Sequence, residues 1–316
     1  MLAHIQRLFA IALLLSVGAW ATLLTQHGRS GWAGIGALLI LLGYAVFLGA
    51  EFAMLRFVQR PDSAPAPGAA QLLRAWWGEV VAAPKVFLWR QPFRSNAEPD
   101  NLIVSDSVAP TGVVLVHGFF CNRGFWNPWM RELRADRVPF IAVNLEPAFG
   151  SIDDYALVVE AAVARMEAVT ALPVVLVGHS MGGLAIRAWL AHFNADARVR
   201  RIITIGTPHH GTWLARFGHT TNGKQMRLAS PWLTQLAAKE TESRRGRFTC
   251  FFGHCDNIVF PVATGTLADA ENLHVPATAH VHMAFQAVVF NEVGRWLAPA
   301  MPEPMAELRD PDALPK

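Results

Sequence analysis

The sequence predicts an α/β fold, in which a mostly parallel sheet is covered by helices on both faces and follows two membrane-spanning helices. Three observations lead to this prediction. From Thr111 onward, apolar runs of strand length alternate with segments of helical periodicity, which is typical of parallel sheets. One of these runs ends in a glycine-rich turn that contains a serine. Before Thr111 lie two long and nearly uncharged apolar runs.

The N-terminal sixty residues account for the apolar composition. The 316-residue chain is 53% hydrophobic and 16% charged, which is apolar for a soluble protein. Two runs, 8–24 and 31–54, are each about as long as a bilayer core requires, and only Glu51 interrupts the second. We interpret residues 1–60 as a transmembrane hairpin. The alternatives are a cleaved secretory signal, since Ala19-Trp20-Ala21 resembles a cleavage site, and a hairpin buried in a soluble core.

Basic residues flank this hairpin. Arg7 precedes the first run, and only Arg29 lies between the two runs. The basic residues that follow the second run are Arg56, Arg60, Arg74 and Lys85. By the positive-inside rule, the hairpin ends and the domain that follows face the cytoplasm.

Charge and cysteine content limit the other partners. The net charge is +3 without a dense basic run, so no nucleic-acid partner is expected. The cysteines, Cys121, Cys250 and Cys255, are too few for a disulfide framework and agree with a reducing compartment.

A linker and a short pre-domain follow the hairpin. Residues 61–68 form a Pro/Ala-rich linker that we take as the domain boundary. Residues 69–83 have amphipathic helical spacing and contain two tryptophans, which are common at membrane interfaces; a helix packed on the domain is the alternative. Within the pre-domain 69–110, prolines bracket residues 85–93, which predicts a first edge strand. A polar, Pro-rich tail covers 301–316.

The catalytic domain is expected over 111–300. Its predicted strands are 112–116, 140–143, 174–177, 202–205, 248–252 and 272–275. Predicted helices cover 151–170, with Asp153 and Asp154 in the first turn, and 281–297. Functional groups of such a sheet are expected at the carboxyl ends of the strands.

The stretch Gly178-His179-Ser180-Met181-Gly182 is a G-x-S-x-G motif between a strand and a helical pattern. This strand–turn–helix context is the one in which the motif presents a nucleophilic serine. Gly178 and Gly182 keep the turn uncrowded, and the positive end of the helix points at a developing oxyanion. The sequence therefore predicts Ser180 as a nucleophile; an idle serine in a glycine-rich turn is the alternative.

Further reactive groups follow other predicted strands. Asp256 lies just past the strand 248–252, and His280 lies just past 272–275. The order Ser180, Asp256, His280 is typical of a serine hydrolase triad, with His280 as base and Asp256 as its orienting partner. Backbone N–H groups of Met181 and of Phe119, which follows the first strand, are predicted to bind the oxyanion.

These motifs, taken together, resemble the α/β-hydrolase superfamily, and more narrowly its bacterial triacylglycerol lipase/esterase branch. The matching stretches are His117-Gly118-Phe119, Gly178 to Gly183, Gly206-Thr207-Pro208-His209-His210-Gly211-Thr212 and Asp256-Asn257-Ile258-Val259. The resemblance covers roughly 111–297. It implies hydrolysis of a carboxylic ester or lipid without an organic cofactor. Some such lipases bind a structural calcium, but no acidic cluster near Asp256 specifies one here.

Several residues are alternatives within this site. His282 is a reserve base, although the family pattern places the histidine directly after the last strand, which favours His280. Asp269, in a predicted helix over 264–270, is a reserve acid. His209 and His210 lack nearby partners spaced for zinc, so no metal site is expected.

Two further predictions concern the surroundings of the site. Cys121 lies near the oxyanion loop, but a second nucleophile is not expected beside a serine triad. The segment 211–245 is longer than a usual connection. We expect a small cap over the serine; an added packing helix is the alternative. The predicted function is thus a membrane-anchored serine hydrolase for esters, with acyl transfer or an inactive scaffold as alternatives.

Overall fold

The computed structural model describes residues 1–58, 64–103 and 111–297. Its centre is a six-stranded sheet in the order β2-β1-β3-β4-β5-β6, and each neighbouring pair is parallel. The strands are β1 (Val113–Val116), β2 (Phe140–Ala142), β3 (Val174–His179), β4 (Val199–Ile205), β5 (Phe248–Phe252) and β6 (Glu271–His274). The predicted α/β fold with a parallel sheet is therefore confirmed.

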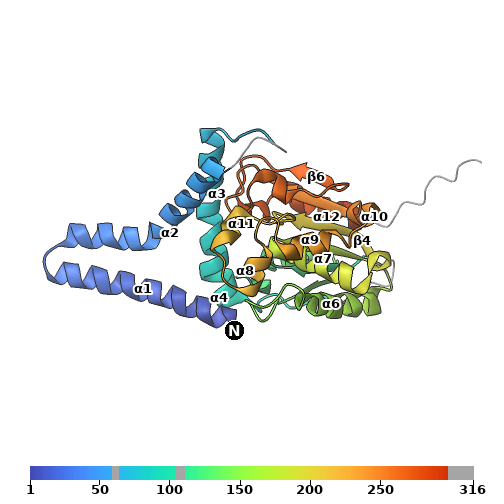
Figure 1. Ribbon diagram of the computed structural model, residues 1–316. Helices are drawn as coiled ribbons and strands as arrows, with labels where there is room; N and C mark the ends of the chain where they lie inside the picture. Colours follow the sequence, from blue (N-terminus) through green and yellow to red (C-terminus); the bar gives the residue numbers. More distant parts are fainter. Residues whose placement is uncertain (59–63, 104–110, 298–316) are drawn as a thin grey trace, which may run out of the picture.

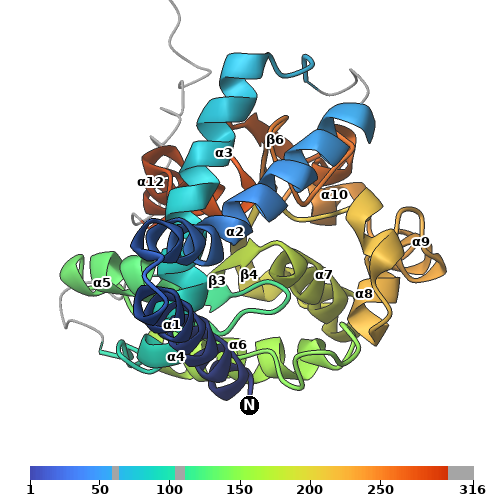
Figure 2. The same cartoon turned by 90° about the vertical axis from the view of Figure 1, so that its left-hand side faces the viewer.

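Helices cover both faces of the sheet, which explains why the strands read as continuous apolar runs. Val114 of β1 packs in the cluster that contains α6 (Tyr155–Thr170) and α7 (Met181–Phe193). Its neighbour Val113 packs in the opposite cluster, with α5 (Asn127–Ala135) and α12 (Ala287–Leu297). Figure 2 shows these two helix layers on either side of β3 and β4.

Shorter helices connect these layers. The pre-domain contains α3 (Ala69–Pro84), a π-helical turn over Lys85–Arg90 and α4 (Gln91–Arg94). The insertion after β4 contains a 3-10 turn over Trp213–Phe217, α8 (Thr221–Gln225), α9 (Pro231–Ala237) and α10 (Glu242–Arg245). The loop after β6 leads into α11 (His280–Met283). Further 3-10 turns cover Arg123–Trp126, Asp196–Arg198 and Val262–Gly265.

The two N-terminal helices, α1 (Leu2–Gln26) and α2 (Ser30–Val58), project together from one side of the body (Figure 1). Both are long and apolar enough to cross a membrane. Only 6% and 17% of their most apolar windows are buried, so these side chains are not packed as in the core of a soluble protein. The N-terminal end of α1 and the C-terminal half of α2 instead contact the body, where Leu2 and Leu55 are buried.

The predicted edge strand over 85–93 is wrong, because this segment is helical and continues α3 into α4. Pro84 has no N–H for the helical ladder, and the turn that follows it is widened to a π-helix. Pro92 lies in the first turn of α4, where a missing N–H costs nothing. Both prolines are thus compatible with helix.

Three helix boundaries also differ from prediction. Helix α6 begins at Tyr155, and no acidic residue lies in its first turn. The carboxylate of Asp153 instead accepts hydrogen bonds from Trp232 and Gln225 of the insertion. The predicted helix over 264–270 is replaced by a 3-10 turn and a bend in which Asp269 has φ +63°. The predicted helix 281–297 is two helices, α11 and α12.

Parts of the predicted linker and pre-domain, and the whole predicted tail, are not described. Residues 61–63 of the linker, 104–110 of the pre-domain and the whole tail 301–316 lie outside the described residues.

Candidate active site

Ser180 occupies the tight turn between β3 and α7. Its φ of +53° is unusual for a residue with a side chain and stores backbone strain. A Cβ at Gly178 would lie 2.7 Å from the nitrogen of Gly183, and one at Gly182 would collide with the carbonyl of Val116. The turn therefore needs both glycines of the motif.

Asp256 and His280 form a buried pair next to this turn. Nδ1 of His280 lies 3.0 and 2.9 Å from the two Asp256 carboxylate oxygens. The carboxylate also accepts the backbone N–H groups of Ile258 and Val259. Burial lowers the pKa of His280, but the Asp256 carboxylate outweighs it and holds this pKa above its usual value. The Asp256 carboxylate thus favours the imidazole tautomer whose Nδ1–H donates to it, which leaves Nε2 free.

Strand β4 brings the pair and the serine together. The N–H of Ser180 donates to Ile205 at 2.8 Å. The next residue, Gly206, has φ +54°, and a Cβ there would lie 2.9 Å from Asp256 Oδ2 and 3.0 Å from His280 Nδ1. The ring of His179 lies 4.7 Å from the His280 ring. The predicted nucleophile, base and acid therefore lie at one end of the sheet.

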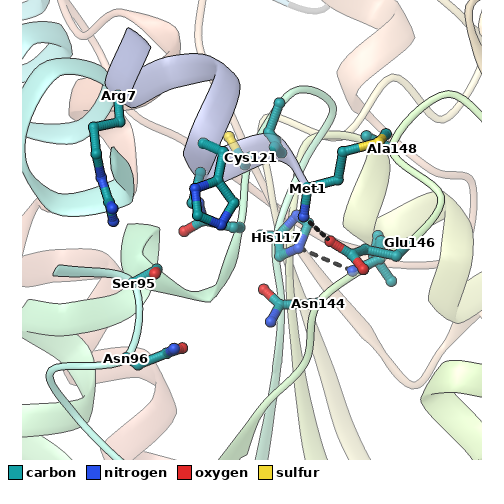
Figure 3. Close-up of a pocket in the computed structure, with 14 residues that line it drawn as sticks. Met1, Arg7, Ser95, Asn96, His117, Cys121, Asn144, Glu146 and Ala148 are labelled. Carbon is teal, nitrogen blue, oxygen red and sulfur yellow. Dashed lines mark hydrogen bonds and ion pairs between the residues drawn. The ribbon is translucent and has the colours of Figure 1, made fainter. Parts of the chain in front are cut away.

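The loop predicted to donate to the oxyanion lies directly against the serine. A Cβ at Gly118 would lie 2.8 Å from the Ser180 Cβ, which keeps the Phe119 backbone close to the turn. His117 braces this loop, because its Nδ1 contacts the Gly118 carbonyl at 2.9 Å. Its Nε2 accepts the Leu145 N–H at 3.0 Å (Figure 3). Burial lowers the pKa of His117 to about 4, so the brace is a neutral imidazole. Behind it lies a cavity of about 360 Å³ that reaches α1 (Figure 3).

Two buried glutamates support the loop after β6 and the start of α11, which together we call the histidine loop. The sequence did not indicate that these glutamates belong to the site. Glu79 of α3 accepts the N–H groups of Val281 and His282 at 3.1 and 3.0 Å. Glu51 of α2 accepts the Asn257 side-chain amide at 2.6 Å, and Asn257 Oδ1 in turn accepts the His280 N–H at 3.2 Å. The signal in the sequence was a single acidic residue in each of two mostly apolar helical segments.

The reserve base and acid have other partners. The His282 ring lies against Gly78 of α3, and its Nε2 lies 2.8 Å from the side-chain nitrogen of Gln286. Asp269 pairs with Arg245 at the surface, at 2.9 Å. Neither side chain is hydrogen-bonded to the Asp256–His280 pair among the described contacts.

The remaining candidates are buried elements of the scaffold. Nε2 of His209 contacts the Thr204 hydroxyl at 3.0 Å, and its carbonyl accepts from Arg187. In the described ranges, no group of three His, Cys, Asp or Glu residues is placed to hold a metal ion. Burial raises the pKa of the Cys121 thiol to about 12, which keeps it protonated and unreactive.

The insertion after β4 packs mainly on the domain. Met226 and Leu233 belong to the core cluster of α6 and α7. Trp213, at the start of the insertion, stacks on Phe260 and joins the cluster that includes Phe52 of α2. The first turn of the insertion therefore lies between the catalytic loops and the C-terminal half of α2. The role of the insertion as a cap stays a prediction.

Comparisons with known proteins agree with this fold. Residues 113–313 match the model of the Alpha/beta hydrolase family. The structure is similar to the mature form of the Bacillus licheniformis lipase BlEst2, with a TM-score of 0.54 and 18% identity over 62% of this chain and 95% of that one. It is also similar to Aspergillus fumigatus lipase B, with a TM-score of 0.52 and 18% identity over 60% of this chain and 54% of that one. No curated protein matched. At this identity the structural likeness shows the fold.

Proposed function

The chain belongs to the alpha/beta hydrolase family, and from this premise we propose that it is a membrane-anchored serine hydrolase that cleaves carboxylic esters. The observation that carries the proposal is the buried Asp256–His280 pair beside the strained turn of Ser180. A histidine held at Nδ1 by a carboxylate leaves Nε2 for proton transfer with a serine hydroxyl.

The reaction has two halves. Ser180 attacks the acyl carbon while His280 takes the hydroxyl proton, and His280 then gives that proton to the leaving alcohol. Water repeats the sequence on the acyl-enzyme and releases the acid. The N–H groups of Phe119 and Met181 hold the tetrahedral oxyanion, and losing one such donor typically slows turnover by about 100- to 1000-fold. Met181 is the first residue of α7, so the helix dipole favours this charge as well.

The helical hairpin supports an ester of a lipid or another apolar acyl group as substrate. Gln6, near the start of α1, donates to the Phe120 carbonyl of the oxyanion loop at 3.1 Å. Glu51 of α2 contacts Asn257 beside the base. Because the ends of both hairpin helices touch the catalytic loops, insertion of the hairpin places the site at the bilayer surface. The flanking basic residues favour the cytoplasmic face.

The test is hydrolysis of p-nitrophenyl esters of increasing acyl length by the detergent-solubilised full chain. Ser180→Ala and His280→Ala are expected to abolish turnover, whereas the matched control His282→Ala is expected to keep most of it. Membrane attachment is tested separately, by carbonate extraction of the membrane fraction.

Two outcomes contradict the proposal. A His280→Ala variant that stays active would assign the base to His282. A folded wild-type protein that is inactive at every chain length would exclude general ester hydrolysis. Transfer of the acyl group to an added alcohol would then identify an acyltransferase, and its absence a catalytically inactive scaffold.

A further inference from the structure

A positively charged cavity lies between α3 and the end of α11. Its volume is about 440 Å³, within the range of small-molecule sites. Residues from α3, the π-helical turn and the end of α11 line it: Arg74, Trp77, Gly78, Val81, Ala82, Lys85, Arg90, His282 and Phe285. No acidic residue is among them.

The three cations of this cavity are not neutralised. Within the described part of the chain, Arg74, Lys85 and Arg90 form none of the salt bridges found. Arg90 is half-buried, and its guanidinium lies 4.9 Å from the ring centroid of Phe285. Burial and the charge of Arg131 lower the pKa of Arg90. Three like charges around one cavity favour an anion, and guanidinium groups suit phosphate in particular.

The surface next to this cavity is apolar and exposed. Leu73, Trp77 and Val81 follow one another at one helical turn along α3, with 64%, 61% and 41% of their surfaces exposed. Trp89 of the π-helical turn and Phe93 of α4 are also exposed apolar side chains, with ring centroids 5.9 Å apart. Such tryptophans beside basic residues are typical of a surface that lies in a membrane interface.

The position of α3 specifies the source of the anion. On its other flank α3 packs against α2, where Trp76 donates to Ala45 and Tyr44 donates to Val80. Figure 1 shows α3 on the side of the body from which α1 and α2 project. A helix is about 10 Å across, so the cavity lies roughly one helix width from α2, whose first half projects with α1.

We propose that this cavity binds the phosphate of an anionic phospholipid, with the lipid acyl chains lying along Leu73, Trp77 and Val81. The proposal rests on the proposed membrane attachment, because the hairpin brings this face to the bilayer. The bound headgroup contacts His282, which shares α11 with His280. Anionic lipid therefore binds next to the element that carries the proposed base.

The test is native mass spectrometry of the full chain in neutral detergent, titrated with phosphatidylglycerol, phosphatidylcholine or soluble glycerol phosphate. We expect one equivalent of phosphatidylglycerol to bind, and phosphatidylcholine and glycerol phosphate to bind at least about tenfold more weakly. Arg74→Gln/Lys85→Gln/Arg90→Gln is expected to lose about tenfold or more in affinity, which corresponds to about 1.4 kcal/mol or more, because it removes the three cations that would contact the phosphate.

The matched control removes three exposed cations elsewhere, in Arg137→Gln/Lys224→Gln/Lys239→Gln, and is expected to bind phosphatidylglycerol like the wild type. Arg74 and Lys85 are exposed, so the double variant at these positions replaces the triple variant if the latter does not fold. Equal binding by wild type and cavity variants, or equal binding of both lipids, would overturn the proposal. Glycerol phosphate binding as tightly as the lipid would assign the cavity to a soluble phosphate instead. Hydrolysis of p-nitrophenyl esters, measured on the same samples, tests the proposed activity separately.

Discussion

Glu79 offers the sharpest test of how the site is held. Its carboxylate is 2% exposed and accepts two consecutive backbone N–H groups of α11. Burial raises the pKa of Glu79 from 4.5 to about 7, against the opposite effect of these two donors. Glu79→Gln keeps the shape and one acceptor oxygen but cannot titrate.

The sign of the pH effect follows from the two pKa values. Between pH 4.5 and about 7 the native protein binds a proton at Glu79 that the unfolded chain has released, so the free energy of unfolding falls as pH rises through this window and is constant above it. The interval from 4.5 to about 7 corresponds to about 3 kcal/mol, at about 1.36 kcal/mol per pH unit. The Gln variant lacks this loss. Its thermal midpoint should therefore rise relative to wild type by roughly 6–12 °C between pH 5 and pH 8, at about 2–4 °C per kcal/mol.

The assay is thermal unfolding in detergent, followed by tryptophan fluorescence at pH 5, 6, 7 and 8. Glu132→Gln, which removes an exposed carboxylate from α5, is the control and should give a difference that does not depend on pH. Parallel midpoint curves for wild type and Glu79→Gln would refute the reasoning, because they would mean that Glu79 does not titrate in this window.

The same variant has a kinetic readout. Glu79 is one of the carboxylates that hold the pKa of His280 above its usual value, after Asp256. The base must be neutral to accept the serine proton, so the acid limb of kcat/KM should lie above pH 6.5 in the wild type and move to lower pH in Glu79→Gln. A merely structural role would lower kcat without moving this limb.

Four further variants test the remaining parts of the site and scaffold. Asp256→Asn should lower kcat by about 10⁴-fold in the ester assay, since an amide stabilises the wrong imidazole tautomer. Gly206→Ala should leave a folded protein without measurable turnover, because its Cβ would lie 2.9 Å from the Asp256 carboxylate. Arg187→Met should lower the free energy of unfolding by about 3–5 kcal/mol, because it leaves the buried charge of Glu240 unpaired, and adding Glu240→Leu should restore most of it. Cys121→Ser should keep most activity, and iodoacetamide should not inactivate the wild type.

Most of the sheet could be predicted because strands β1 to β5 are buried on both faces almost throughout. Such strands are continuous apolar runs, as in Val113–Val116, and polar turn residues follow them directly. The same signal failed at 85–93, because a short apolar run does not distinguish a buried strand from a buried helix. Val86 is fully buried in that segment, but it lies in a helical turn rather than in a strand.

The candidate site likewise contains residues that could be predicted from the sequence and residues that could not. Ser180, Asp256 and His280 each follow a strand, so the topology of a parallel sheet brings them together. Glu51 and Glu79 do not follow from local pattern, because their partners lie 206 and 202 positions away in the chain. Only the packing of α2 and α3 against the histidine loop gives these carboxylates their role.

Helices α2 and α3 also hold the start of α11, in addition to the membrane role proposed for the hairpin. The first N–H groups of a helix have no partner within the helix, and in α11 these belong to His280, Val281 and His282. Each is bound by an acceptor that depends on α2 or α3: Asn257, held by Glu51, accepts the first, and Glu79 accepts the other two. The orientation of the proposed base therefore depends on α2, which belongs to the proposed membrane hairpin, and on α3, which packs against it. We expect the active site to be complete only when both helices are folded against the domain.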